Sequence, residues 1–80
     1  MFYVYLLESE SAPAKRYVGF SEDLRNRLEH HNSGKSRFTS RHRPWKLVTY
    51  LAFSDREKAL EFERYLKSAS GIAFANKRLR

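Results

Sequence analysis

The pattern of apolar and polar residues along the chain predicts three strands. β-Branched and aromatic residues fill positions 2–7, 16–20 and 45–53, which is typical of strands. The first two segments are separated by a polar stretch with Pro13, so we expect them to pair as an antiparallel hairpin with a long loop. The third segment is apolar on both faces, and we therefore expect it to be well buried.

Two helices are predicted, one before and one after the third strand. Ser21 is the expected N-cap of the first helix, which ends near His31 and is followed by Gly34 as a left-handed cap. The segment Ser54-Asp55-Arg56-Glu57 has the spacing of a capping box, so a second helix begins there and runs until Gly71 ends it. We expect one or two further helical turns in the basic tail.

The element order β-β-α-β-α predicts an α+β fold. In such a fold, helices flank a small, three-stranded and mainly antiparallel sheet. A chain of 80 residues is long enough for one compact core and too short for a separate regulatory module. We therefore expect a single domain over residues 1–80.

Composition and charge narrow the class of function. The chain has no cysteine, which excludes a disulfide framework and thiolate chemistry. No apolar run approaches the roughly 20 residues of a membrane span, and a signal-peptide pattern is missing, so we expect a soluble cytoplasmic protein without a membrane partner. The net charge of +7 together with 15% aromatic residues favours nucleic-acid binding over an ordinary small basic protein.

A basic segment between the first helix and the third strand is the expected nucleic-acid-binding surface. No Asp or Glu occurs from residue 30 to 54. Cations of this kind bind phosphates without reading base sequence, and their affinity falls with salt. The cations are Lys35, Arg37, Arg41, Arg43 and Lys46.

The first predicted helix has polar residues where apolar ones belong. Leu24 and Leu28 form its apolar stripe, His31 falls between them, and Arg27 lies at the edge of the stripe. Turning a cation and an imidazole toward the protein costs free energy unless they are paired or line a cleft. A structural interpretation, with a snorkelling arginine and a hydrogen-bonded core histidine, remains open at this point.

The second predicted helix repeats this pattern with the opposite charge. Glu63 falls on its apolar face, close to Ala59 and Leu60 on the helical wheel. One interpretation is a structural ion pair with the inward arginine. The other is a lone carboxylate that holds Mg²⁺ or Mn²⁺ beside phosphate, while water and substrate oxygens complete the coordination.

The hairpin strands contribute tyrosines. Because side chains alternate along a strand, Tyr5 and Tyr17 can lie on the same side of the hairpin. Gly19 shares the face of Tyr17, and a glycine inside a strand often marks the close approach of another group. The alternative is that both tyrosines are core aromatics.

Together these residues resemble a known family. The segments Tyr3-Val4-Tyr5 and Tyr17-Val18-Gly19, followed by Arg27 and His31 and then by Glu63 in an Ala-x-x-x-Glu sequence, are similar to the GIY-YIG nuclease domain. The resemblance covers nearly the whole chain and is strongest for the stand-alone, single-domain branch. The residues that the helical wheel marked as misplaced are therefore the ones that match the family.

The resemblance implies a metal-dependent endonuclease that hydrolyses DNA phosphodiester bonds in DNA repair or processing. It implies one divalent cation, Mg²⁺ or Mn²⁺, held by Glu63, and an arginine contact from Arg27 to the scissile phosphate. Tyr17 is the expected base, and Tyr5 orients the water. His31 either takes the proton onward or orients Tyr5. These five catalytic residues are expected to converge on one surface cleft.

The expected partner is DNA. Because this family usually gains specificity from appended domains, we expect the chain to cut weakly or according to DNA structure, or to act with a protein partner. Asn76 is a candidate counterpart of a late asparagine in the family. The alternative function is a non-catalytic nucleic-acid-binding module that retains the fold, although the presence of Arg27 and Glu63 argues against it.

Overall fold

A computed structural model describes residues 1–80. Its elements are β1 (Phe2–Ser9), β2 (Arg16–Ser21), α1 (Leu24–Asn32), a short 3-10 helix (Ser40–His42), β3 (Trp45–Phe53), α2 (Arg56–Leu66) and α3 (Ala69–Arg78). The predicted α+β class is confirmed, and α3 is a full helix where only one or two turns were expected. None of the helices is long and apolar enough to cross a membrane.

The sheet is antiparallel throughout, and β1 is its central strand. The strand order is β2-β1-β3, and Tyr5 of β1 lies opposite Gly19 of β2 and Tyr50 of β3. The expectation that the third strand would be well buried is wrong, because β3 is an edge strand in which Tyr50 is 52% exposed. Its apolar residues on both faces reflect helices on both sides of the sheet.

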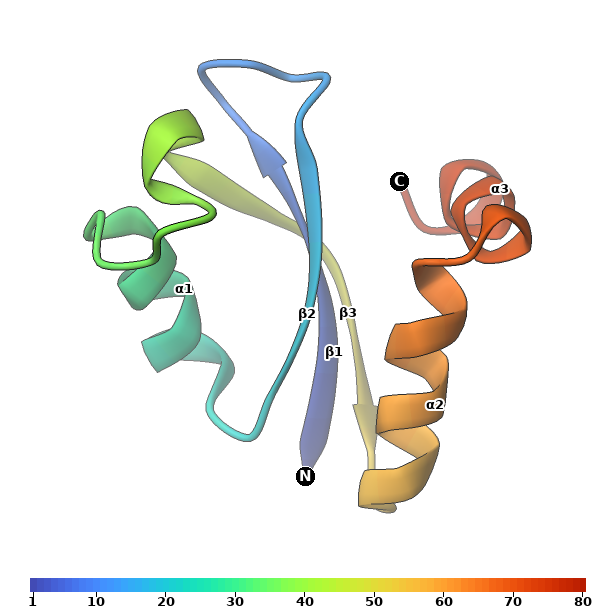
Figure 1. The fold of residues 1–80 in the computed structure, drawn as a ribbon. Coiled ribbons are helices and arrows are strands. Elements are labelled where there is room, and N and C mark those ends of the chain that lie inside the picture. Colours follow the sequence, from blue (N-terminus) through green and yellow to red (C-terminus); the bar gives the residue numbers. More distant parts are fainter.

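The helices form a layer on each face of the sheet (Figure 1): α1 covers one face, and α2 with α3 covers the other. Tyr5 and Leu7 face α1 and pack with Trp45. Val4 and Leu6 point to the opposite face, because side chains alternate along β1. On that face they pack with Ala59, Leu66 and Ala75.

Both predicted helix starts are shifted by one or two residues. Asp23, not Ser21, caps α1, and its carboxylate accepts a bond from the Asn26 N–H at 3.1 Å. The Ser21 hydroxyl instead accepts the Asp23 N–H at 3.0 Å and closes the turn before the helix. Likewise Asp55, not Ser54, caps α2. In both cases the carboxylate accepts hydrogen bonds from N–H groups that the first turn of the helix leaves free.

The segment that was predicted as the second helix contains the end of one helix, α2, and the start of another, α3. The chain turns after α2, and Ser68 caps α3 by accepting the Gly71 N–H at 3.2 Å. Gly71 therefore lies inside the first turn of α3, so the expectation that it ends a helix is wrong. A side chain at Gly71 would overlap the Tyr65 carbonyl, so the glycine permits the close approach of α3 to α2. Gly34 follows α1 with φ of +85°, as predicted.

Candidate active site

The centre of the candidate site is a buried hydrogen bond between Tyr5 and His31. The Tyr5 hydroxyl oxygen lies 2.9 Å from Nε2 of His31, and the two residues are 1% and 2% exposed. Tyr5 reaches this position across Gly19, where any side chain would overlap its hydroxyl. The missing side chain in β2 thus makes room for the tyrosine of β1.

Thr39 holds the other side of the His31 ring. Its hydroxyl oxygen lies 2.8 Å from Nδ1 of His31, and its carbonyl accepts the Trp45 indole N–H at 2.8 Å. Thr39 is fully buried although it belongs to the polar segment that precedes β3. The sequence interpretation missed it, because this segment has no periodicity that would mark one residue as inward-facing.

Burial keeps both members of the central pair uncharged. Desolvation lowers the pKa of His31, and the positive charges of Arg27 and His30 lower it further. Desolvation raises the pKa of Tyr5, and the nearby Tyr17 raises it further. Tyr5, His31 and Thr39 therefore form a chain of neutral groups, each with one proton to donate. The hydrogen bonds can be donated in the direction from Tyr5 through His31 to Thr39, or in the opposite direction.

Tyr17 connects the buried pair to the surface. Its ring centre lies 4.8 Å from that of His31 and 6.2 Å from that of Tyr5. Tyr17 itself is half-buried and lines a surface pocket beside the end of α2. The sequence prediction that Tyr5 and Tyr17 share one side of the hairpin is confirmed by their packing in one cluster.

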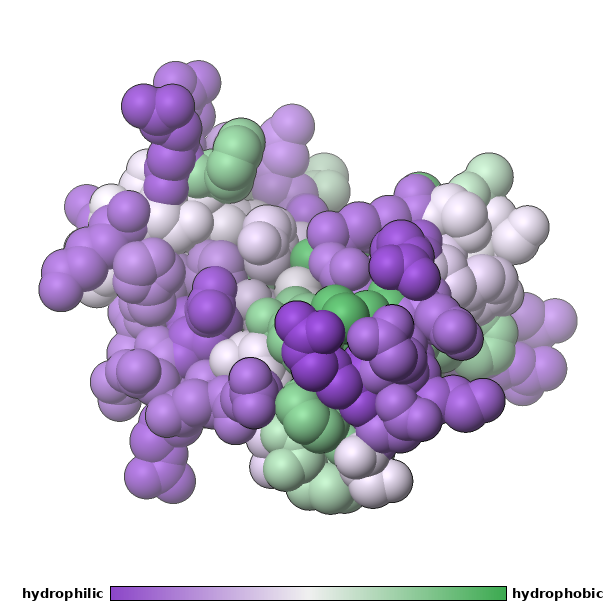
Figure 2. Space-filling model, turned by 60° about the horizontal axis from the view of Figure 1, so that its bottom comes forward, coloured by the Kyte–Doolittle hydropathy of each residue, from purple (hydrophilic) through white to green (hydrophobic).

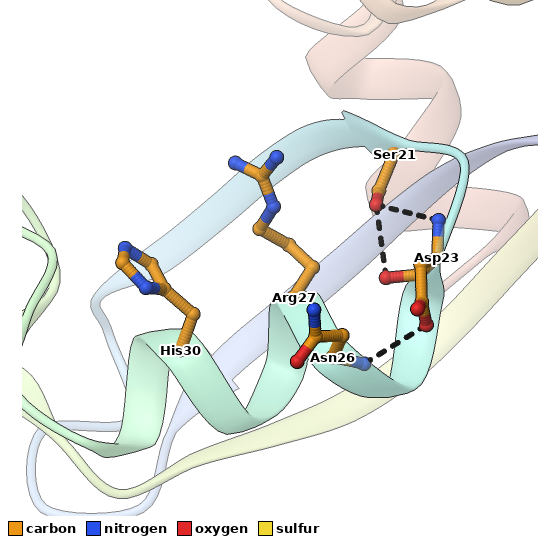
Figure 3. A pocket seen from close by; sticks show the side chains of 5 residues that line it. All are labelled: Ser21, Asp23, Asn26, Arg27 and His30. Carbon is orange, nitrogen blue, oxygen red and sulfur yellow. Dashed lines mark hydrogen bonds between the residues drawn. The ribbon is translucent and has the colours of Figure 1, made fainter.

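Arg27 lies at the surface. It lines a polar cavity of about 280 Å³ together with Ser21, Asp23, Asn26 and His30. Figure 3 shows Arg27 and His30 extending to the same side of α1. At the edge of the apolar stripe a long arginine can keep its head in water, whereas His31 in the middle of the stripe is buried.

Glu63 approaches from the other layer. Its side chain is 17% exposed, and its carboxylate lies 2.5 Å from the Lys67 ammonium, one helical turn further on. Arg27 and Glu63 come from helices on opposite faces of the sheet, and no pocket is lined by both side chains. Both charges nevertheless act on Tyr5: Arg27 lowers the pKa of its hydroxyl, and Glu63 raises it.

Glu63 offers a single carboxylate to a divalent cation. No three His, Cys, Asp or Glu side chains lie together, so the chain offers no complete cage. One shielded carboxylate fits a hard cation that keeps water and substrate oxygens as its other ligands. Lys67, whose side chain is 55% exposed, would have to leave the carboxylate to make way.

The basic segment presents its cations to solvent. Lys46 also lies 3.9 Å from Glu8, and the Arg43 guanidinium packs against Gly34. The other cations of the segment form no ion pair. All five predicted nucleic-acid-binding residues are exposed: Lys35, Arg37, Arg41, Arg43 and Lys46.

Comparison with known proteins places this geometry in context. Residues 1–77 match the family model of the GIY-YIG catalytic domain. A UPF0213 protein of Streptococcus pneumoniae is 38% identical over 66 residues, which cover 81% of this chain and 65% of the relative. A homolog of the structure-specific endonuclease subunit SLX1 in Giardia intestinalis is 37% identical over 65 residues, covering 76% of this chain and 18% of the relative.

A solved structure has a similar fold. The solution NMR structure of a UPF0213 protein from Bacillus halodurans matches with a TM-score of 0.58 and 30% sequence identity. The match covers 99% of this chain and 87% of that chain. The chain spans less than two thirds of the Giardia and Streptococcus relatives, at 18% and 65% of their lengths.

Proposed function

The chain belongs to the GIY-YIG family, and from this premise we propose that it is a metal-dependent endonuclease that hydrolyses DNA phosphodiester bonds in DNA repair or processing. The family and the relatives named structure-specific endonuclease subunits support a nuclease. The structural observation that carries the proposal is the buried Tyr5–His31 pair packed against Tyr17, within reach of the charges of Arg27 and Glu63.

The proposed roles follow from exposure and charge. Tyr17 reaches the surface, so it is the proposed base that takes the proton of the attacking water. Tyr5 is buried and stays protonated, so it acts on Tyr17 and His31 as a positioning residue. His31 is neutral and can accept or donate a proton at Nε2.

Arg27 is the proposed contact to the scissile phosphate. Its guanidinium is exposed, and its planar fork can bind two phosphate oxygens at once. Attack on phosphorus adds negative charge to these oxygens, and a cation fixed beforehand stabilises the transition state. Glu63 is the residue that would hold one Mg²⁺ or Mn²⁺ ion. Such an ion supplies Lewis acidity toward the phosphate when bound.

DNA is the proposed substrate, held by the exposed cations of the basic segment. They contact phosphates rather than base edges, so affinity falls as salt rises. Specificity then comes from DNA structure or from a protein partner. The relatives of Giardia and of Meyerozyma guilliermondii are named as subunits, which supports a partner.

A non-catalytic nucleic-acid-binding module is the alternative. The Glu63–Lys67 ion pair favours it, because a carboxylate already paired with an ammonium has less need of a metal ion. This alternative expects no metal-dependent cleavage by the wild type. It also expects changes at Glu63 to act only through stability.

A nicking assay on supercoiled plasmid with Mg²⁺ or Mn²⁺ separates the two. We expect Glu63→Gln to abolish nicking and to leave DNA binding equal or slightly tighter, because the variant loses a negative charge near phosphate. Arg27→Ala is expected to reduce both the nicking rate and the DNA affinity. Glu61→Gln is the matched control, since Glu61 is exposed on the same helix. Nicking by Glu63→Gln at the wild-type rate, in samples folded by circular dichroism, would show that the mechanism is wrong.

A further inference from the structure

A second pocket opens beside Tyr17. It has a volume of about 400 Å³ and lies between the start of β2, the end of α2 and the inner side of α3. Three cations line it, Arg16, Lys67 and Arg80, together with the Asn76 amide. No carboxylate lines it, although two of the cations are paired with carboxylates that lie outside the lining, Arg16 with Glu8 and Lys67 with Glu63. A pocket with this lining is suited to an anion.

Arg80 is the least satisfied of the three cations. One of its terminal nitrogens, Nη1, is buried and has no hydrogen-bond partner. Burial lowers the pKa of Arg80, the positive charge of Arg16 lowers it further, and the Glu8 carboxylate acts in the opposite direction. Arg16 has the Glu8 carboxylate 3.9 Å from its Nε and donates one N–H to the Asn76 carbonyl oxygen at 2.8 Å. Arg80 has neither an ion pair nor a side-chain hydrogen bond. An oxyanion here would accept the free N–H groups and relieve the repulsion.

The rest of the pocket is apolar. Val18, Leu66 and Ile72 complete its lining, so cations and apolar side chains line the same hollow. Figure 2 shows a strip of apolar atoms between the hydrophilic surface on the α1 side and that on the α2 side. A sugar–phosphate backbone has the same mixture, because charged phosphates are separated by apolar sugar faces.

We propose that Arg16, Lys67 and Arg80 form a subsite for a backbone phosphate of the nucleic acid, adjacent to the phosphate that is cleaved. That the ligand is a nucleic-acid phosphate rests on the proposed function, whereas the location of the subsite rests on the pocket. Tyr17 lines this pocket and also packs on His31, so a phosphate bound here positions the neighbouring phosphodiester at the proposed base. Guanidinium groups suit the role, because their planar forks bind two phosphate oxygens.

The first test uses inorganic phosphate alone. The Nε–Hε signals of the arginines are followed by NMR during a phosphate titration at constant ionic strength. We expect the Arg16 and Arg80 signals to shift in a saturable manner, and the signal of Arg64, which is exposed on α2 and lines no pocket, to stay nearly constant. Equal shifts at all three, or none at Arg16 and Arg80, would overturn the proposal.

The second test uses DNA and the variants Arg80→Gln, Arg80→Lys and Arg64→Gln. We expect Arg80→Gln to weaken duplex binding several-fold and to reduce the slope of log K against log salt by about 0.9, the value for one lost phosphate contact. Arg80→Lys should restore the slope but not the full affinity. The fold should survive, because the buried Nη1 of Arg80 makes no bond that the variants could lose; equal thermal midpoints check this.

The two proposals fail separately. If the wild type never cleaves DNA but phosphate shifts Arg16 and Arg80, and Arg80→Gln weakens binding, the subsite stands and the nuclease does not. If the wild type cleaves, and Arg80→Gln matches Arg64→Gln in binding and in nicking, the subsite is wrong and the nuclease stands.

Discussion

The hydroxyl of Thr39 lies 2.8 Å from Nδ1 of His31, so the segment that carries the basic residues also holds the histidine bonded to Tyr5. Both Thr39 and His31 are buried, so a side chain that lost this hydrogen bond could not form one with water instead without a cost in free energy. The position of the basic segment and the orientation of the histidine ring are therefore linked through one hydrogen bond.

Replacing Thr39 tests this link. Thr39→Val has the same shape but leaves Nδ1 of His31 without a partner, so we expect unfolding free energy to fall by about 1–3 kcal/mol. Nicking should fall further than stability explains, because the ring loses its fixed orientation. Thr39→Ser keeps the hydroxyl and should recover both. Urea denaturation and plasmid nicking measure the two effects; a Thr39→Val variant as stable and active as Thr39→Ser would contradict the role.

The contact between Gly19 and Tyr5 leads to a second prediction. Gly19→Ala introduces a methyl group where the Tyr5 hydroxyl lies, and overpacking of this kind costs about 1–3 kcal/mol. In a Tyr5→Leu background the same substitution should cost much less, because leucine does not reach across β2. A double-mutant cycle by urea denaturation checks the coupling. Equal costs of Gly19→Ala in both backgrounds would show that the two residues do not compete for space.

The neutral state of His31 predicts a pH dependence of stability. Its pKa is lowered in the fold, so the unfolded chain binds more protons below the ordinary histidine pKa of about 6.5. Stability should therefore fall as the pH falls from about 6.5 toward the pKa of the folded state, with a slope of at most about 1.4 kcal/mol per pH unit from this group. Thermal midpoints from pH 7 to 5 should drop less steeply for His31→Gln than for wild type. The control His42→Gln should keep the wild-type slope.

The ion pair of Glu63 with Lys67 predicts competition with a metal ion. Lys67→Met frees the Glu63 carboxylate, so we expect Mn²⁺ to bind at lower concentration than in the wild type, as followed by electron paramagnetic resonance. Lys58→Met removes an exposed lysine of the same helix and should leave the Mn²⁺ affinity nearly unchanged. Unaltered Mn²⁺ affinity in Lys67→Met would mean that the cation does not use Glu63.

Strands were easier to predict than helix ends. The apolar runs at 16–20 and 45–53 match β2 and β3 closely, because β-branched and aromatic residues favour strands. The N-caps were not resolved, since Ser21 and Asp23 are both good caps and only the backbone decides between them. The break at Ser68 was hidden by the helical pattern continuing on both sides of it.

Within the candidate site, periodicity located buried residues better than exposed ones. His31 lies in the middle of an apolar stripe, and the structure buries it as the wheel indicated. Arg27 has a side chain long enough to leave the stripe, so its phase alone did not fix its exposure. The Glu63–Lys67 pair had a signal that was overlooked, a glutamate followed four residues later by a lysine on one helix.

Asn32 at the end of α1 determines how freely the basic segment can move. Its side-chain amide donates to the Trp45 carbonyl at 3.0 Å and accepts the Trp45 N–H, so it pairs with β3 as a neighbouring strand would. The two ends of the 33–44 segment are thereby joined before any DNA arrives. In the proposed complex with DNA, binding would therefore not have to offset the entropy cost of closing a twelve-residue loop, and the cations would contact the phosphates as an ordered array.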